Sequence, residues 1–277
     1  MKRILLAFVF VFAFHSTALA TWSIIALDRS TGQVIIASAT CVPQSGFPGR
    51  PSRDLMDIQA VIVPGVGVAA CQAGVDNTRA NQILVYQELL KGTDPAEILE
   101  MLHQDERIQS RQFGILDMQG RSIGFSGENN RFAALHVSGR VGEDIFYQVQ
   151  GNILFSERVM YDAALAFTKV DGTLADRVMA AMEAADDAGG DSRCTCEREP
   201  KPVAACNGKT SHVAYIAIAD RGDVLGTSHN DGDYYAYISV TDENILPAEN
   251  ANPVRTLRMR YDAWKNDGSP RLPPPAR

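Results

Sequence analysis

A threonine that follows a candidate cleavage site has the clearest chemical potential in this sequence. The chain begins with Lys2 and Arg3, continues through an apolar run at 4–14, and then reaches Ala18-Leu19-Ala20-Thr21. A basic start, a short apolar run and two small residues in this arrangement are typical of a secretory signal peptide. Cleavage after Ala20 makes Thr21 the first residue of the mature protein.

An N-terminal threonine carries both a nucleophile and a base. Its hydroxyl becomes a good nucleophile only when a base takes the proton, and its own α-amino group can be that base. A model α-amino group has a pKa of about 7.7 to 8, so a useful fraction is neutral near physiological pH. We therefore expect Thr21 to attack an amide or peptide carbonyl. Two alternatives remain: a small first residue is common in exported proteins, and cleavage after Ala18 would leave Leu19 first.

Charge and hydropathy limit the classes of partner. The formal net charge is −7. Removal of the leader takes away two basic residues, Lys2 and Arg3, so the mature chain is more acidic still. An acidic chain without a basic stripe is a poor candidate for binding nucleic acid or an anionic membrane surface. The leader's apolar run is shorter than the roughly 20 residues of a membrane-spanning helix, and no later run reaches that length. We expect a periplasmic or secreted protein that is soluble after export.

All five cysteines lie after the leader, at Cys41, Cys71, Cys194, Cys196 and Cys206. An oxidising compartment favours disulfides, and the odd number leaves one thiol over. The last three cysteines and His212 could instead form a zinc cluster, but their spacing matches no standard zinc finger. We expect no metal and no cofactor. The expected bridges join Cys41 to Cys71, and Cys206 to Cys194 or Cys196; the spacing alone does not fix the pairing.

Strands and helices are expected in an alternating order of hairpins and helix pairs. Expected strands cover 22–27, 34–37, 59–63, 67–70, 112–117, 122–126, 146–149, 213–219 and 234–240. Expected helices begin at Asp76 or Asn77 and end near 90, and cover 94–102, 156–167 and 174–185, with a short helix at 253–264. Hairpins favour antiparallel sheets, and nearly continuous apolar strands favour sheets that are covered on both faces. The expected fold is α+β, a four-layer αββα sandwich of two mostly antiparallel sheets.

The expected domain organisation has three parts. Residues 1–20 form the signal peptide, and residues 21–245 form the αββα domain. Residues 246–277 form a C-terminal extension that ends in a Pro-rich tail. No linker divides the central part, and no repeat of fixed period is present.

This layout, with a threonine at its start, resembles the N-terminal nucleophile (Ntn) hydrolases, and more narrowly the bacterial family DUF1028. The matching stretches are Thr21 to Ala26 with Thr31-Gly32, Gly67 to Ala73, Arg111 to Asp117, Val149 to Leu154, and Ala188 to Arg193. The resemblance implies the αββα fold more firmly than any reaction. The chain departs from the family pattern by inserting 194–209. At Thr40 and Cys71 the relatives more often carry Ser and Thr.

An amide hydrolase of this type needs a nucleophile, a base and donors for the tetrahedral oxyanion. We expect Thr21 to be the nucleophile and Asn152 to donate to the oxyanion, and Asp191 to hold the Thr21 ammonium or Arg111. Arg111 could orient a substrate carboxylate, and Gln72 could line the same cleft. Each has a structural alternative: a turn or cap residue for Asn152, a turn carboxylate for Asp191, a salt bridge for Arg111, and core hydrogen bonding for Gln72.

The sequence thus favours an exported Ntn-type hydrolase that acts on a small-molecule or peptide substrate. A non-catalytic αββα module that binds an envelope component is the main alternative, and a self-assembling structural protein is the third. Stacked sheets of this kind often pair with copies of themselves, so a homo-oligomer is among the expected partners.

Overall fold

Two antiparallel sheets form the centre of the molecule. A computed structural model describes residues 21–47 and 53–274, so the expected signal peptide at 1–20 lies outside the described residues. The larger sheet has the strand order β10-β9-β2-β1-β8-β7, and the smaller has the order β3-β4-β5-β6. The strands of the larger sheet are β1 (Thr21–Asp28), β2 (Gln33–Thr40), β7 (Leu135–Val141), β8 (Ile145–Asn152), β9 (Val213–Ala219) and β10 (Ala236–Thr241); those of the smaller are β3 (Ala60–Val63), β4 (Gly67–Ala73), β5 (Arg111–Asp117) and β6 (Ser122–Ser126).

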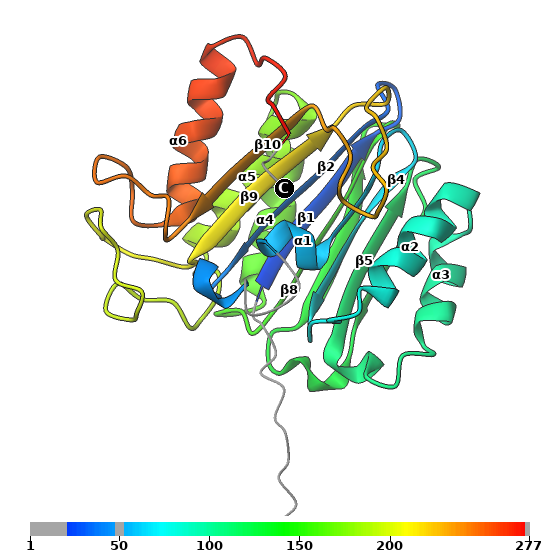
Figure 1. Cartoon of the computed structure of the whole chain (residues 1–277), viewed down its shortest axis with the longest axis horizontal. Helices are drawn as coiled ribbons and strands as arrows, with labels where there is room; N and C mark the ends of the chain where they lie inside the picture. The colour runs from blue at the N-terminus through cyan, green and yellow to red at the C-terminus, as the bar shows by residue number, and fades with distance from the viewer. Residues whose placement is uncertain (1–20, 48–52, 275–277) are drawn as a thin grey trace, which may run out of the picture.

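Helices cover the outer face of each sheet. Figure 1 shows α2 and α3 beside the smaller sheet, and α4, α5 and α6 on the other side of the molecule. Their bounds are α2 (Ala80–Lys91), α3 (Pro95–Leu102), α4 (Arg158–Lys169), α5 (Leu174–Asp187) and α6 (Pro253–Asn266), while the short α1 (Leu55–Gln59) lies near one end of the sheets. Three 3-10 turns occupy Gln44–Gly46, Ile108–Ser110 and Glu128–Asn130. The expected α+β sandwich is confirmed.

Alternation along β1 explains why the sheets stack. Trp22, Ile24 and Ala26 belong to the core between the larger sheet and its helices. Ile25 and Leu27 belong to the core between the two sheets. Successive side chains of a strand point to opposite faces, so an unbroken apolar strand needs a cover on both sides. The inner sheet surfaces and the helix layers supply these covers.

Several boundaries differ from the sequence-based expectation. Helix α2 begins at Ala80, later than expected, because Arg79 has a left-handed backbone (φ 61°). The Asp76 carboxylate instead accepts hydrogen bonds from the backbone of Thr78 and Asn81 and closes a turn. Strand β7 and helix α1 were not expected. β7 alternates exposed and half-buried residues at the edge of its sheet, so its sequence lacks the apolar run of the central strands.

The cysteine pairing is partly as expected. Cys196 bridges Cys206, which is one of the two expected partners, but Cys41 bridges Cys194 rather than Cys71. Cys71 is a buried free thiol. The reason is the strand face: Cys71 packs with the α2 and α3 layer, on the side of β4 that faces away from the sheet carrying Cys41.

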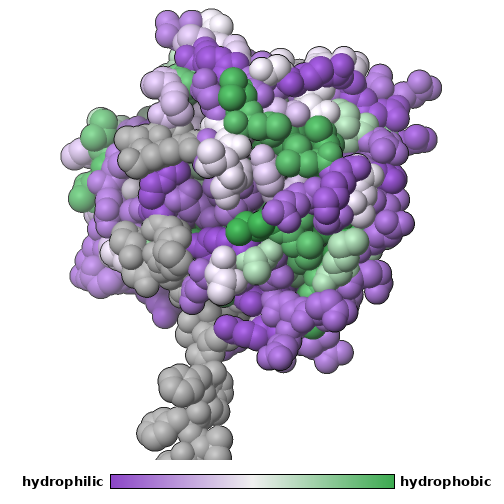
Figure 2. Space-filling view, turned by 45° about the vertical axis from the view of Figure 1, so that its right-hand side comes forward, coloured by the Kyte–Doolittle hydropathy of each residue, from purple (hydrophilic) through white to green (hydrophobic). Residues whose placement is uncertain are grey.

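The molecular surface is mainly hydrophilic on the face shown in Figure 2, with apolar residues gathered in a few separate patches. Within residues 21–47 and 53–274, no helix combines the length and apolar character needed to cross a membrane.

Candidate active site

Thr21 opens the strand that lies near the middle of the larger sheet. In the antiparallel register Thr21 lies opposite Thr40 of β2 on one side and Asn152 of β8 on the other. Side chains that are paired in this way share one sheet face. Thr21 has the same parity as Ile25 and Leu27, so this face is the one directed at the smaller sheet.

The Thr21 hydroxyl is held by its neighbour. Thr21 Oγ1 donates a hydrogen bond of 3.3 Å to Thr40 Oγ1, and Thr40 Oγ1 also accepts from the backbone N–H of Val42 at 3.3 Å. Thr21, Thr40 and Asn152 are all buried. The hydroxyl is therefore fixed in one direction, which a nucleophile needs.

Gln72 connects the two sheets at this point. Its Nε2 donates to the carbonyl oxygen of Thr21 at 3.1 Å and to Gln112 Oε1 at 2.8 Å. Its Oε1 accepts from Ser23 Oγ at 2.7 Å and from Gln59 Nε2 at 3.1 Å. Both amide donors and the acceptor oxygen are in use, so the amide orientation is determined by four neighbours. Gln72 thus fixes the backbone of Thr21 from the opposite sheet.

The space in front of Thr21 is narrow. A pocket with room of about 10 Å³ is lined by Thr21, Leu55, Ile58, Gln59, Cys71, Gln72, Ala73 and Val75. A volume of this size holds about one water. Helix α1 supplies three of these residues, so it forms one wall of the space in front of the Thr21 hydroxyl.

Asp191 is buried and fully engaged. It lies opposite Leu154, two residues after Asn152, in an isolated β-bridge. Its Oδ2 accepts from the backbone N–H of Cys41 at 3.0 Å, and Arg193 donates to both carboxylate oxygens. Asp191 thus contacts the residue that directly follows Thr40. Its ion-pair partner in the structure is Arg193, whereas the sequence-based expectation was the Thr21 ammonium or Arg111.

Arg111 lies on the smaller sheet and is held by an ion pair. Its Nε donates to Asp105 Oδ2 at 2.7 Å, and its Nη1 donates to the carbonyl oxygen of Gly74 at 2.7 Å. In the β4–β5 register it lies opposite Ala73, which lines the pocket in front of Thr21. The structure therefore brings Thr21, Asn152 and Gln72 together directly. Asp191 reaches this group only through Cys41, and Arg111 only through the strand that carries Ala73.

Sequence reasoning missed two members of this group. Thr40 bonds to the Thr21 hydroxyl, and Gln112 donates to the carbonyl oxygen of Gly151 at 2.8 Å, next to Asn152. One sequence signal was available. Ser23, Thr40 and Gln112 are polar residues within otherwise apolar strands, and all three side chains point between the sheets.

Cys71 also lines the pocket in front of Thr21, but its thiol is a poor nucleophile. Burial raises the pKa of the Cys71 thiol far above its usual range, with a further contribution from Asp76. A thiol in that state carries almost no thiolate, which is the reactive form. Among the described residues, no cluster of three or more His, Cys, Asp or Glu side chains could hold a metal ion.

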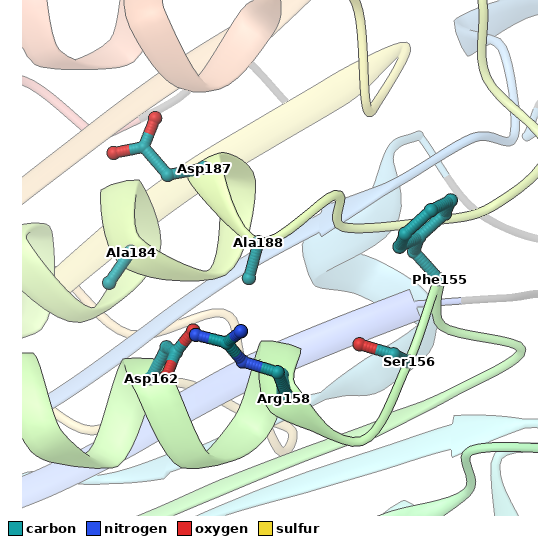
Figure 3. A pocket seen from close by; sticks show the side chains of 7 residues that line it. All are labelled: Phe155, Ser156, Arg158, Asp162, Ala184, Asp187 and Ala188. Atoms are coloured by element: carbon teal, nitrogen blue, oxygen red, sulfur yellow. The ribbon is translucent and has the colours of Figure 1, made fainter.

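A much larger pocket lies elsewhere, on the helix layer. It has a volume of about 430 Å³ and is lined by Phe155, Ser156, Arg158, Asp162, Ala184, Asp187 and Ala188. Figure 3 shows that it lies between the start of α4 and the end of α5, with the Arg158 guanidinium next to Asp162. Its lining includes none of Thr21, Thr40 or Asn152, so we place the candidate chemistry at the end of β1 instead.

Comparisons with known proteins agree with the fold. A family model with the description "Family of unknown function (DUF1028)" matches residues 21–198. A crystal structure of a DUF1028 protein from Silicibacter pomeroyi is similar to the chain with a TM-score of 0.59 and 21% sequence identity, over 89% of this chain and 86% of that one. At this identity the likeness shows the fold alone. A search of curated proteins finds no match.

Proposed function

This chain belongs to the DUF1028 family, and from that premise we propose that it is an exported amide or peptide hydrolase of the N-terminal nucleophile type. The proposal rests on the position of Thr21. It is the first residue of β1, it faces the second sheet, and its hydroxyl is bonded to Thr40. If signal peptidase cuts after Ala20, the new α-amino group is formed on the residue that the two sheets already hold in place.

The proposed reaction begins with proton transfer. The neutral α-amino group takes the proton of Thr21 Oγ1, and the oxygen attacks the carbonyl carbon of the substrate amide. The carbonyl oxygen becomes an oxyanion, and the resulting ammonium returns its proton to the leaving nitrogen as the C–N bond breaks. Water then attacks the Thr21 ester, the amine again acts as base, and the product leaves as a carboxylic acid.

Asn152 is the proposed oxyanion donor. It lies opposite Thr21 across the β1–β8 pairing, and it is fully buried at the end of β8. Removing one oxyanion donor of this kind typically costs a factor of about 10² to 10³ in kcat. The backbone of its neighbour Gly151 is held by Gln112 at 2.8 Å, which supports a fixed direction for this strand end.

The other three residues have supporting roles in the proposal. Gln72 holds the Thr21 carbonyl and lines the pocket. Asp191 anchors the end of β2 through Cys41, next to Thr40, and favours a positive charge nearby. Arg111 precedes Gln112 on β5, so its side chain lies on the other face of the smaller sheet, where Asp105 and the Gly74 carbonyl hold it. In the proposal it fixes the strand end opposite Ala73 rather than contacting a substrate carboxylate. No metal or cofactor takes part.

The first experiment identifies the mature N-terminus. The protein is expressed with its leader, recovered after export, and examined by intact mass and N-terminal sequencing. We expect a chain that begins Thr21-Trp22-Ser23 with an unblocked amine. If the chain begins at Leu19, or if Thr21 is blocked, the Thr21 α-amino group is not available as a base and the proposal is wrong.

The second experiment measures hydrolysis of a fluorogenic amide library by the chain that begins at Thr21. Thr21→Ala should lower kcat by roughly 10³-fold or more, and Thr21→Ser should keep part of it. Thr31→Ala is the matched control, because Thr31 is exposed in the β1–β2 turn. Equal turnover by Thr21→Ala and wild type would leave the binding module as the better explanation.

A further inference from the structure

The segment 209–212 carries buried polar atoms that lack partners. Lys209 is 5% exposed, Ser211 0% and His212 3%. Within the described part of the chain, Lys209 Nζ, Ser211 Oγ and His212 Nδ1 make no hydrogen bond. Native proteins leave few buried polar atoms unsatisfied, and a group of them calls for a bound water or ion.

The backbone of this segment is fixed. The N–H of His212 donates to the carbonyl oxygen of Thr40 at 2.7 Å, and the N–H of Asp242 donates to the carbonyl oxygen of His212 at 2.9 Å. The hydroxyl of Thr210 donates to the Asp186 carboxylate. These bonds hold the segment between the ends of β2, β10 and α5, so the polar side chains cannot simply turn out into water.

The charged side chains that act on His212 are all positive. Burial first, and then Lys209, Arg193 and Arg198, lower the pKa of His212 to about 4. Burial also lowers the pKa of Lys209, an effect that Asp242 opposes. A buried ammonium without a partner costs several kcal/mol, so this arrangement is poor unless an anion completes it.

The nearby carboxylates are already engaged. Asp242 Oδ1 accepts from the backbone N–H of Gln44 at 2.8 Å, and it is the carboxylate whose field acts on Lys209. Asp191 forms an ion pair with Arg193 at 2.8 Å. Asp242 is too far from Lys209 for an ion pair, and Asp191 is satisfied elsewhere.

A route to solvent lies beside Lys209. A polar pocket of about 350 Å³ is lined by Asp186, Asp187, Asn207, Gly208, Lys209, Thr210, Asn250, Asn252 and Arg255. Its two carboxylates, Asp186 and Asp187, are both paired with Arg255. Arg255 offsets one of these two negative charges and Lys209 offsets the other, so the pocket lining has no net negative charge that would exclude a small anion.

We propose that the segment 209–212 is a binding site for a small oxyanion, either a carboxylate or a phosphate. Lys209 Nζ supplies the charge, and His212 donates from Nδ1 in the tautomer that carries a proton there. The family match ends at residue 198, before this segment. Lys209 is the last residue of the expected insertion 194–209, and Ser211 and His212 follow it directly. The proposed site therefore lies outside the matched range, and it does not depend on the hydrolase proposal.

Thermal unfolding of the purified full chain tests the proposal. The midpoint is measured at constant ionic strength in sodium chloride, with sodium acetate or sodium phosphate replacing it stepwise. We expect a saturable rise of about 5 °C with one of the two oxyanions at roughly 100 times its Kd. The ion that produces the rise identifies the ligand class, and no rise with either overturns the proposal.

The variant Lys209→Met distinguishes between two roles of Lys209: binding of an anion, and long-range attraction to Asp242 that stabilises the fold. If the site binds an anion, Lys209→Met loses the oxyanion response and unfolds at a higher temperature than wild type in chloride, because an uncompensated buried charge is gone. If Lys209 instead stabilises the fold through its electrostatic attraction to Asp242, the variant unfolds at a lower temperature than wild type, which overturns the proposal. Lys201→Met, exposed in the same insertion, is the matched control and should keep the response.

A calorimetric titration of the wild-type chain with sodium phosphate and with sodium acetate covers the case in which Lys209→Met does not fold. Saturable heat with a stoichiometry near one for either ion supports the site. Featureless dilution heat with both ions contradicts it.

Discussion

The hydroxyl of Thr21 donates a hydrogen bond of 3.3 Å to the hydroxyl of Thr40, its register partner on the neighbouring strand. The two residues begin and end a single hairpin, β1 and β2, so the turn between them brings the start of one strand to the end of the other. A side chain at the extreme end of a chain is normally mobile. Here the hairpin and Gln72 hold it.

Thr40→Val tests how much this hydrogen bond orients the nucleophile. The substitution keeps the shape and removes an acceptor for Thr21 Oγ1 and for the N–H of Val42. We expect a loss of about 1 kcal/mol in the free energy of unfolding and a clear fall in kcat with little change in KM. Steady-state kinetics and urea unfolding measure both, and Thr40→Ser should restore wild-type values. A Thr40→Val enzyme with unchanged kcat would show that Thr40 does not orient Thr21.

Gln72 and Gln148 form a natural pair for comparing satisfied and unsatisfied buried amides. Gln72→Met removes four hydrogen bonds and leaves Ser23, Gln59 and Gln112 with unpaired atoms. We expect a loss of about 2–4 kcal/mol. Gln148 is completely buried, and neither its Nε2 nor its Oε1 has a partner within the described residues.

Gln148→Met should therefore stabilise the protein by about 1 kcal/mol, because it replaces unsatisfied polar atoms by apolar ones of similar volume. Chemical denaturation of both variants measures the difference. Equal destabilisation by the two substitutions would mean that Gln148 is satisfied by ordered water.

The two disulfides should contribute unequally to stability. Cys41 and Cys194 are 153 residues apart in the sequence, whereas Cys196 and Cys206 are 10 apart. Loop entropy predicts a loss of about 5 kcal/mol when the first bridge is replaced by two alanines, and about 3 kcal/mol for the second. Guanidinium unfolding of the two double variants measures this. The reverse order would indicate that native-state packing, rather than loop closure, determines their contributions.

Asp176 should make the protein sensitive to acid. Burial by itself raises the pKa of this carboxyl, but hydrogen bonds from Lys265, Thr173 and Tyr261 outweigh it and lower the pKa to about 2. Because the folded pKa is depressed, the contribution is present above the unfolded pKa of about 4 and is lost as the pH falls through 2. After a discount for solvent screening of this partly exposed carboxylate, the contribution is about 1 kcal/mol.

Unfolding free energies measured between pH 5 and pH 2 test this contribution. The wild type should lose stability across this interval, and Asp176→Asn should show a flatter profile with lower stability at pH 5. Asp162→Asn is a suitable control, since the Asp162 pair with Arg158 is exposed. Parallel profiles for wild type and Asp176→Asn would place the acid sensitivity at other carboxyls.

Cys71 should be unreactive in the folded protein. Burial raises the pKa of its thiol, so attack on a thiol reagent requires unfolding. Mass spectrometry after iodoacetamide treatment should show no label under native conditions and one label in guanidinium without reductant. Rapid native labelling would mean that the α2 and α3 layer over the smaller sheet opens readily.

Local patterns were sufficient to predict most strands and helices. Strand β9 was expected with its observed bounds because an apolar, β-branched run is bounded by polar residues. Helix α3 was expected because Asp94 caps it and Pro95 occupies its first turn, and both features are present. These features act over a few residues, which is the range over which a sequence determines its own local structure.

The sequence by itself was sufficient to predict the α+β sandwich and the family. It also predicted that the strand beginning at Thr21 is buried. Only the tertiary structure decided that Cys41 pairs with Cys194 and that Asp191 engages Arg193. It also decided that Thr40 and Gln72 hold Thr21. The partners in these three cases lie between 2 and 153 positions apart, and most come from different strands or loops. Parity along a strand shows which residues share a face, but which sheet or helix layer that face meets depends on the packing of the whole core.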